Sequence, residues 1–130
     1  MAIRVVRLGT PRVPGEGLRL GSVRRPPRGV KKSDFAKRDY YDLWLPALSP
    51  SQAVVSRAMS QAWTDARWKK FERDYRREMT APAAKQLIEL LAKMSHHADF
   101  SVGCYCEDER RCHRSILRKL LEEEGGKIGL

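Results

Sequence analysis

Residues 103–117, GCYCEDERRCHRSIL, concentrate the side chains of this chain that are best suited to chemistry. All three cysteines of the chain fall here, together with a histidine and several arginines. Thiolates act as nucleophiles and metal ligands, and imidazole exchanges protons near neutral pH. Guanidinium groups bind carboxylates and phosphates. The segment therefore predicts a functional site, and the residue types leave several kinds of site to weigh.

A zinc site is the first alternative. Cys104, Cys106, Cys112 and His113 form a Cys₃His donor set, which is enough to complete a tetrahedron. The spacing is unusual for zinc, because C-x-C in a strand places both sulfurs on one face. Adjacent side chains on a helix, such as Cys112 and His113, diverge by about 100°. We therefore expect no resident cofactor, and we keep zinc as the alternative.

Two other thiol sites would pair a cysteine with an arginine at a fixed spacing. Cys104 and Arg110 have the C-x5-R spacing of a phosphatase-like thiol site, and Cys106 and Arg111 have a C-x4-R spacing that suits a sulfurtransferase. The intervening loop is acidic and contains no glycine, so it would repel a dianion and could not form a tight backbone cradle. Both alternatives are disfavoured.

The favoured interpretation is a site at the start of the last predicted helix. Cys112 and His113 fall in its first turn, flanked by Arg110, Arg111 and Arg114. The positive potential of a helix start and the cationic neighbours favour a Cys112 thiolate and also bind anions. His113 would act as acid or base and Cys112 as nucleophile. In the competing non-functional interpretation, the cysteines are small buried residues and His113 is a satisfied boundary residue.

Basic side chains are concentrated in the first third of the chain. Residues 1–40 hold 11 Lys and Arg against 3 Asp and Glu, so they carry +8 of the total net charge of +10. Such asymmetry favours phosphate-bearing partners. Arg24 and Arg28 are predicted to clamp anionic groups from a loop that includes Gly29, and Arg114 is predicted to hold a second anionic position.

Strands and helices alternate along the chain. Strands are predicted over 3–8 and 18–23, where short apolar runs end at Gly and Pro, and a buried strand over 99–106. Apolar residues recur at helical spacing after Ser51, after Thr64 and after Pro82, and Cys112 begins a fourth helix that ends at Gly125. Residues 28–50 are predicted to be irregular, with a helical turn that Ser33 would cap.

This order predicts a single α/β domain over residues 1–130, with a small two-layer or three-layer sheet of parallel strands and about four helices. Its parts are a basic third (1–40), a helical middle (51–97), and a final strand and helix (99–124). A helical crossover makes the last strand parallel to an earlier one. Because ligands gather at the carboxyl ends of such strands, residues 24–32 and 104–114 are expected to open onto one crevice.

Several stretches of the chain resemble the family catalogued as domain of unknown function 488, in its small YeaO-like branch. They are SVRRPPRGVKKSDF (22–35), LWLPALSPS (43–51), WKKFERDYRREM (68–79) and FSVGCYCEDERRCHRSIL (100–117). The resemblance implies an α/β fold and supplies no activity. The positions that mark the family would be Arg24, Pro27, Arg28, Gly29, Cys112, His113 and Arg114. Ser22 stands where the family commonly has an aspartate.

The sequence therefore favours a protein that binds a phosphate-bearing small molecule or nucleotide, and it leaves open whether the protein is an enzyme. The alternatives are a non-catalytic nucleic-acid-binding module that uses the basic third and a zinc-stapled interaction domain. The chain lacks an 18-residue apolar run and an apolar signal segment, so no membrane partner is expected. With no export signal, the three cysteines are expected in a reducing cytoplasm, and their odd number argues against a disulfide framework. Oligomeric state and specific partners stay open.

Overall fold

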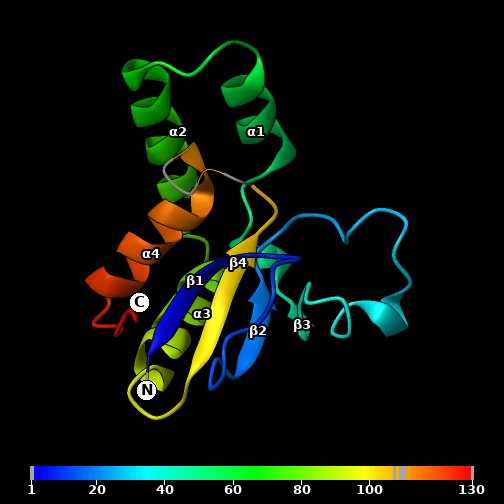
Figure 1. Ribbon diagram of the computed structural model, residues 1–130. Coiled ribbons are helices and arrows are strands. Elements are labelled where there is room, and N and C mark those ends of the chain that lie inside the picture. The colour runs from blue at the N-terminus through cyan, green and yellow to red at the C-terminus, as the bar shows by residue number, and fades with distance from the viewer. Residues whose placement is uncertain (1, 107, 109–110, 130) are drawn as a thin grey trace.

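The computed structural model describes residues 2–106, 108 and 111–129. Its sheet has four parallel strands in the order β1-β4-β2-β3 (Figure 1). The strands are β1 (Ile3–Arg7), β2 (Leu18–Gly21), β3 (Leu43–Trp44) and β4 (Phe100–Cys104). The predicted α/β class with parallel strands is confirmed. The three strands expected from the sequence are present, and β3 is an addition to them.

The last strand, β4, lies at the centre of the sheet between β1 and β2. All five of its residues are buried, which explains its almost uninterrupted apolar character. Gly103 is required there, because a Cβ at this position would lie 2.6 Å from the Val6 carbonyl oxygen. The central position of β4 brings the segment that follows it between the segments that follow β1 and β2.

Four helices accompany the sheet: α1 (Gln52–Met59), α2 (Asp65–Glu78), α3 (Pro82–Met94) and α4 (His113–Glu123). The predicted starts are confirmed in three of them. The side chain of Ser51 accepts a hydrogen bond from Val54 N, and that of Thr64 accepts one from Arg67 N. Pro82 occupies the first turn of α3, where its missing N–H costs nothing.

Helices α3 and α4 lie on one face of the sheet, and α1 and α2 extend beyond the carboxyl ends of the strands (Figure 1). Loops contribute to the other face, where Arg19 contacts the backbone of Thr10 and Asp39. Helix α4 packs on β1, β4, α2 and α3, and α1 packs on α2. The main core includes Ile3, Val102, Tyr75 and Leu117, all fully buried. On the loop-covered face, the Tyr41 ring lies directly over Gly21, where a Cβ would come within 2.5 Å of the ring.

The connection over 28–50 is more regular than the sequence predicts. It contains two 3₁₀ turns, Lys32–Asp34 and Pro46–Leu48, besides β3. The prediction that Ser33 caps the first turn is wrong, because the extended residue before the turn is Lys31. Strand β3 has only two residues, and pairing with β2 together with the hydrogen bond from Trp44 Nε1 to Val23 O (2.6 Å) holds it in place. Such tertiary contacts leave no local sequence signal.

Among the helices that the described residues form, none is both long enough and apolar enough to span a bilayer.

Candidate functional site: three thiols beside an arginine and tyrosine groove

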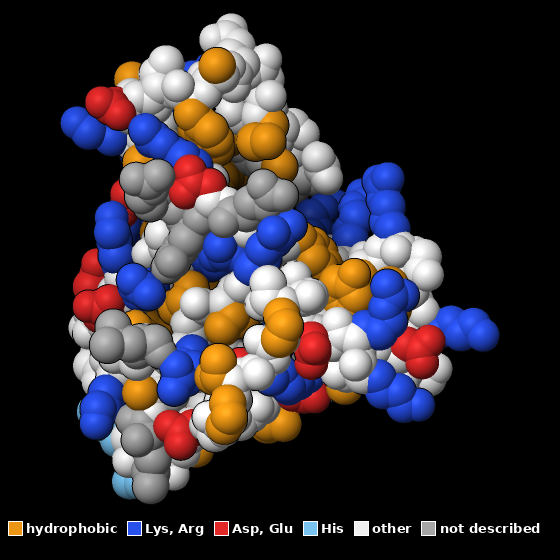
Figure 2. Space-filling view, viewed as in Figure 1, with side chains coloured by type: hydrophobic (Ala, Val, Ile, Leu, Met, Phe, Trp, Pro, Cys, Tyr) orange, Lys and Arg blue, Asp and Glu red, His pale blue; other side chains and the backbone are white. Residues whose placement is uncertain are grey.

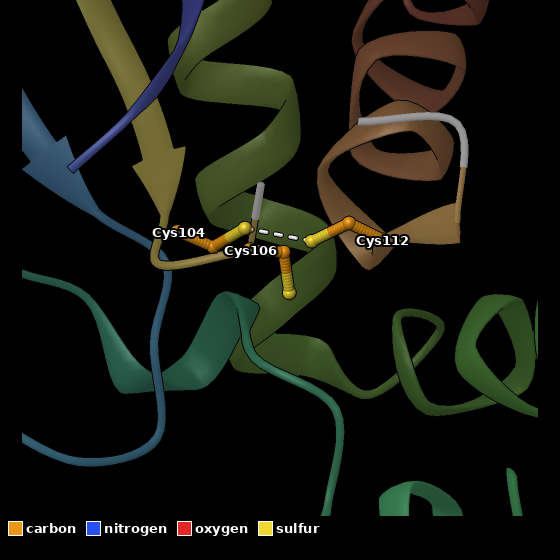
Figure 3. Close-up of side chains that lie close together, drawn as sticks. All are labelled: Cys104, Cys106 and Cys112. Carbon is orange, nitrogen blue, oxygen red and sulfur yellow. Dashed lines mark hydrogen bonds between the residues drawn. The ribbon is translucent and has the colours of Figure 1, made fainter. Parts of the chain in front are cut away.

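Three cysteines meet at the carboxyl edge of the sheet, and we call them the thiol cluster (Figure 3). Cys104 ends β4, Cys112 directly precedes α4, and Cys106 lies in the loop between them. Their sulfur atoms all lie within 4.8 Å of one another, and those of Cys104 and Cys112 are 2.7 Å apart. All three are free cysteines. This donor set could hold a metal ion.

Two local features of the backbone bring the sulfurs together. Strand β4 ends at Cys104, so Cys106 is released from the strand and can turn towards its neighbours. Cys112 is the N-cap of α4 and has extended dihedrals, φ −138° and ψ 148°. The divergence expected for two adjacent helical side chains therefore does not apply to Cys112 and His113.

His113 is the imidazole of the site, and only 8% of its surface is exposed. Its Nε2 lies 2.7 Å from the Ser22 carbonyl oxygen and 3.2 Å from Ser22 Oγ. A carbonyl oxygen only accepts, so Nε2 carries the proton, and the lone pair of Nδ1 faces Cys112 Sγ at 3.7 Å. Burial lowers the pKa of His113 to about 4, which keeps the ring neutral at physiological pH.

The three thiols share their protons unequally. Hydrogen bonding from Cys104 and then from Cys112 lowers the pKa of Cys106, whose side chain is exposed. Hydrogen bonding to Cys106 helps to raise the pKa of Cys104 to about 11. Hydrogen bonding to the other two sulfurs raises that of the buried Cys112. Cys106 is therefore the thiol that ionises most readily. The catalytic roles predicted for Cys112 and His113 stay predictions.

Arg114 is buried beneath the thiol cluster, with 4% of its surface exposed. Its Nη1 donates to the carbonyl oxygens of Val6 (3.3 Å) and Cys104 (3.4 Å) and lies 3.7 Å from Cys104 Sγ. The guanidinium thus joins the ends of β1 and β4 and places a positive charge next to a sulfur. These described contacts are all with other groups of the protein. The predicted role of Arg114 in holding a second anionic position stays a prediction.

A groove of about 620 Å³ lies beside the thiol cluster. It is lined by Arg25, Pro26, Pro27, Arg28, Tyr40 and Tyr105. The Tyr105 hydroxyl donates to Arg25 O at 2.9 Å, and the rings of Tyr40 and Tyr105 meet edge to face with centroids 6.3 Å apart. Tyr105 follows Cys104 and precedes Cys106, so it links the groove to the thiols. We call these six residues the arginine–tyrosine groove.

The predicted site residues are divided between separate places. Arg28 lines the arginine–tyrosine groove, and Gly29 follows it with a positive φ of 71°. Arg24 lines another groove, with Pro46, Pro50 and Glu78 among its neighbours. The segments after β2 and β4 do adjoin, through Tyr105 and through the bond from His113 to Ser22.

Sequence reasoning missed the two tyrosines of the groove. The sequence offered one signal for Tyr105, which stands between two cysteines, and one for Tyr40, which directly precedes a buried tyrosine. Arg110, which was predicted to flank the site and to be the arginine of the C-x5-R interpretation, lies outside the described residues.

The fold and the site define a class: a small parallel α/β protein with a thiol–histidine corner at the carboxyl edge of its central strand. A family model described as the active DUF488-N3 subclade matches residues 3–125, so the chain belongs to the DUF488 family, whose function is uncharacterised. No curated protein and no solved structure shows significant similarity to the chain. The family resemblance predicted from the sequence is confirmed.

Proposed function

We propose that the protein binds a phosphate-bearing small molecule with an aromatic ring, such as a nucleotide, in the arginine–tyrosine groove. The observation that supports this most is the pairing of two guanidinium groups, Arg25 and Arg28, with two aromatic rings in one groove. Guanidinium groups bind phosphate oxygens through paired hydrogen bonds. Aromatic rings stack on bases and on other planar rings.

The size of the groove supports a ligand of this class. Its volume of about 620 Å³ falls within the range of about 300–1,000 Å³ that is typical of small-molecule sites. Pro26 and Pro27 restrict the loop between the two arginines, because each proline ring fixes its own φ. A restricted loop loses less conformational entropy when a ligand is bound.

The surface charge around this loop also supports an anionic ligand. Lys and Arg side chains gather over the segment that follows β2, at the right of the view in Figure 2. Arg24, Arg25, Arg28, Lys31 and Lys32 all belong to this segment and are exposed or half-exposed. A concentration of one sign of charge raises the local concentration and the association rate of an oppositely charged ligand.

The proposal is tested by calorimetric titration with ADP, adenosine and pyrophosphate at fixed salt. ADP should bind more tightly than either of the other two, since it alone offers both a ring and phosphates. Arg25→Ala and Arg28→Ala should each weaken ADP binding by about tenfold or more, the usual cost of losing a charged hydrogen bond. Arg77→Ala, which removes the same charge from an exposed position on α2, is the control and should bind ADP like the wild type.

If Arg25→Ala and Arg28→Ala bind ADP as tightly as Arg77→Ala and the wild type do, the groove is excluded as the binding site. The same titration separates this proposal from a nucleic-acid-binding module. Engaging about six phosphates would change the affinity for a single-stranded oligonucleotide by orders of magnitude between low and moderate salt, whereas ADP binding should respond weakly. A zinc ion, as in the alternative of a zinc-stapled domain, is compatible with the proposal, because the sulfurs do not line the groove.

Catalysis by Cys112 and His113 would be a further property of the same edge of the sheet, and the proposal does not require it. A cytoplasmic location, likewise, is an expectation from cysteine usage.

A further inference from the structure

We propose that the thiol cluster and His113 together bind one thiophilic metal ion, Zn²⁺ in the first place, and that this Cys₃His site ties the start of α4 to the end of β4. The inference is independent of the proposed function, because it concerns other residues and a different ligand. Three features carry it: the spacing of the donor atoms, the tautomer of the imidazole, and the charge next to the sulfurs.

The donor atoms are spaced nearly as a tetrahedral site requires. Zn–S bonds of about 2.3 Å and Zn–N bonds of about 2.0 Å give tetrahedral edges of about 3.8 Å between sulfurs and about 3.6 Å between sulfur and nitrogen. Cys112 Sγ and His113 Nδ1 are 3.7 Å apart, which matches such an edge. The three sulfurs lie within 4.8 Å of one another. Donors from a strand end, a loop and a helix start therefore converge on one point.

Two small movements complete the tetrahedron. Cys104 and Cys112 have to separate by about 1 Å, because their sulfurs are 2.7 Å apart against an edge of about 3.8 Å. Among the described residues only the three sulfurs share the mutual 4.8 Å spacing, so Nδ1 has to move towards Cys104 and Cys106. Rotations about the torsions of these three side chains would supply the movements, and Cys106 itself is exposed, so the cluster has a sulfur that an ion can reach from solvent.

The tautomer of His113 already suits a metal ligand. Metal-binding histidines usually donate their other N–H to a carbonyl or carboxylate oxygen, which fixes the tautomer and the ring orientation. In this protein the Nε2–H of His113 donates to Ser22 O at 2.7 Å, so Nδ1 presents its lone pair on the side of the sulfurs. Ser22, which directly follows β2, thus supplies the supporting contact that a zinc ligand needs.

The surrounding charge suits a zinc–thiolate group. Binding displaces to solvent the protons that the cysteines still carry, and Zn²⁺ with three thiolates and a neutral imidazole has a net charge of −1. The Arg114 guanidinium, whose Nη1 lies 3.7 Å from Cys104 Sγ, offsets this charge inside the protein. A buried anionic group next to a buried cation costs less desolvation free energy than either group alone.

The test measures zinc binding to metal-free, reduced protein in competition with a chromophoric chelator. We expect one Zn²⁺ per chain in the wild type. Cys104→Ser, Cys106→Ser, Cys112→Ser and His113→Ala should each weaken binding by at least about tenfold. The matched control is His96→Ala. His96 is an exposed histidine just after α3 that contacts Gly125 O, and the zinc affinity of this variant should equal that of the wild type.

X-ray absorption at the zinc edge of the wild-type protein provides a measurement that needs no substitution of a buried residue. Three sulfur neighbours and one nitrogen neighbour would support the proposal. A wild-type protein that retains no stoichiometric zinc would overturn it. So would His113→Ala that binds as tightly as His96→Ala, or an ion that the absorption data place among oxygen ligands.

Discussion

Two polar clusters lie along β2 and β4, and they differ in how their charges and donors are satisfied. In the first, which we call the Arg19 cluster, Arg19 is fully buried and binds both carboxylate oxygens of Glu16, at 2.8 and 3.0 Å. Its Nη1 donates to the carbonyl oxygens of Thr10 and Asp39, both at 2.7 Å. Ser101 of β4 donates to Glu16 Oε2 at 2.7 Å. This cluster joins two loops to the sheet.

The thiol cluster at the other end of β4 is held together differently. The described contacts of its buried sulfur atoms are with another sulfur, with the Arg114 guanidinium and with an imidazole nitrogen. The Arg19 cluster therefore satisfies its charges within the protein, whereas the thiol cluster offers the donor atoms of the metal site that we propose. The predictions below test this contrast.

The largest effect is expected from Arg19→Met. This substitution leaves the Glu16 carboxylate buried without its guanidinium, and breaking a buried ion pair from one side typically costs about 3–5 kcal/mol. That is a large fraction of the total stability of a domain of this size. Urea unfolding followed by circular dichroism measures the loss. A loss below about 1 kcal/mol would remove the contrast between the two clusters.

Acid should weaken the Arg19 cluster over a defined pH range. Burial alone would raise the pKa of Glu16, but hydrogen bonds from Arg19, Ser101 and Val13 N lower it to about 2, from an ordinary value of 4.5. Because the folded pKa is the lower one, the contribution to stability is complete above about pH 4.5 and is lost as the pH falls from 4.5 towards 2. The shift corresponds to a free energy on the order of 3 kcal/mol.

Unfolding free energies measured across pH 2–5 check this expectation. Glu16→Gln should flatten the acid limb of the stability curve, whereas Glu122→Gln, at an exposed position on α4, should leave its slope unchanged. Parallel curves for wild type and Glu16→Gln would contradict the assignment.

A smaller effect is expected at the contact between β2 and α4. Ser22 Oγ donates to Gly103 O at 2.9 Å, and Gly103 O also accepts from Ser22 N at 3.0 Å. Ser22→Ala therefore removes this hydrogen bond and the longer one between Oγ and His113 Nε2 (3.2 Å). Gly103 O and His113 Nε2 each keep another partner, so we expect a loss of about 0.5–1.5 kcal/mol. Thermal unfolding compares it with Ser49→Ala, an equivalent deletion on an exposed turn. Loss of several kcal/mol would mean that Ser22 has a larger role in holding His113 than its hydrogen bonds suggest.

The smallest effect is expected for Arg12→Ala. Arg12 binds Asp42 through two nitrogens, at 2.8 and 3.2 Å, but both side chains are about one quarter exposed. Exposed and half-exposed ion pairs contribute about 0–1 kcal/mol. Urea unfolding in low and high salt should show a loss within that range, and high salt should reduce it further. A loss equal to that of Arg19→Met would show that burial does not decide the strength of these pairs.

Much of the fold could be predicted from local sequence signals, and much of the site could not. Ser51, Thr64 and Pro82 mark helix starts because capping depends on a few adjacent residues. The apolar run of β4 likewise indicates a buried strand. In contrast, the convergence of the thiols depends on an extended backbone at Cys112, which adjacent residues do not specify.

Burial of Arg19 was equally hard to foresee, because a charged residue in an alternating strand ordinarily faces solvent. The pairing partner, Glu16, stands three residues earlier across a glycine, and only the folded loop turns its carboxylate back onto the strand. Long-range polar contacts of this kind appear only when the tertiary structure is known.

The contrast between a completed cluster and one that a metal ion completes is tested most directly by titrating Co²⁺ into the metal-free, reduced wild-type protein and recording its absorption. Co²⁺ adopts the geometry of the zinc site and reports its ligands. The account predicts saturation at one equivalent, with intense tetrahedral d–d bands and a sulfur-to-cobalt charge-transfer band. Weak octahedral bands without charge transfer, as for hydrated Co²⁺, would contradict it.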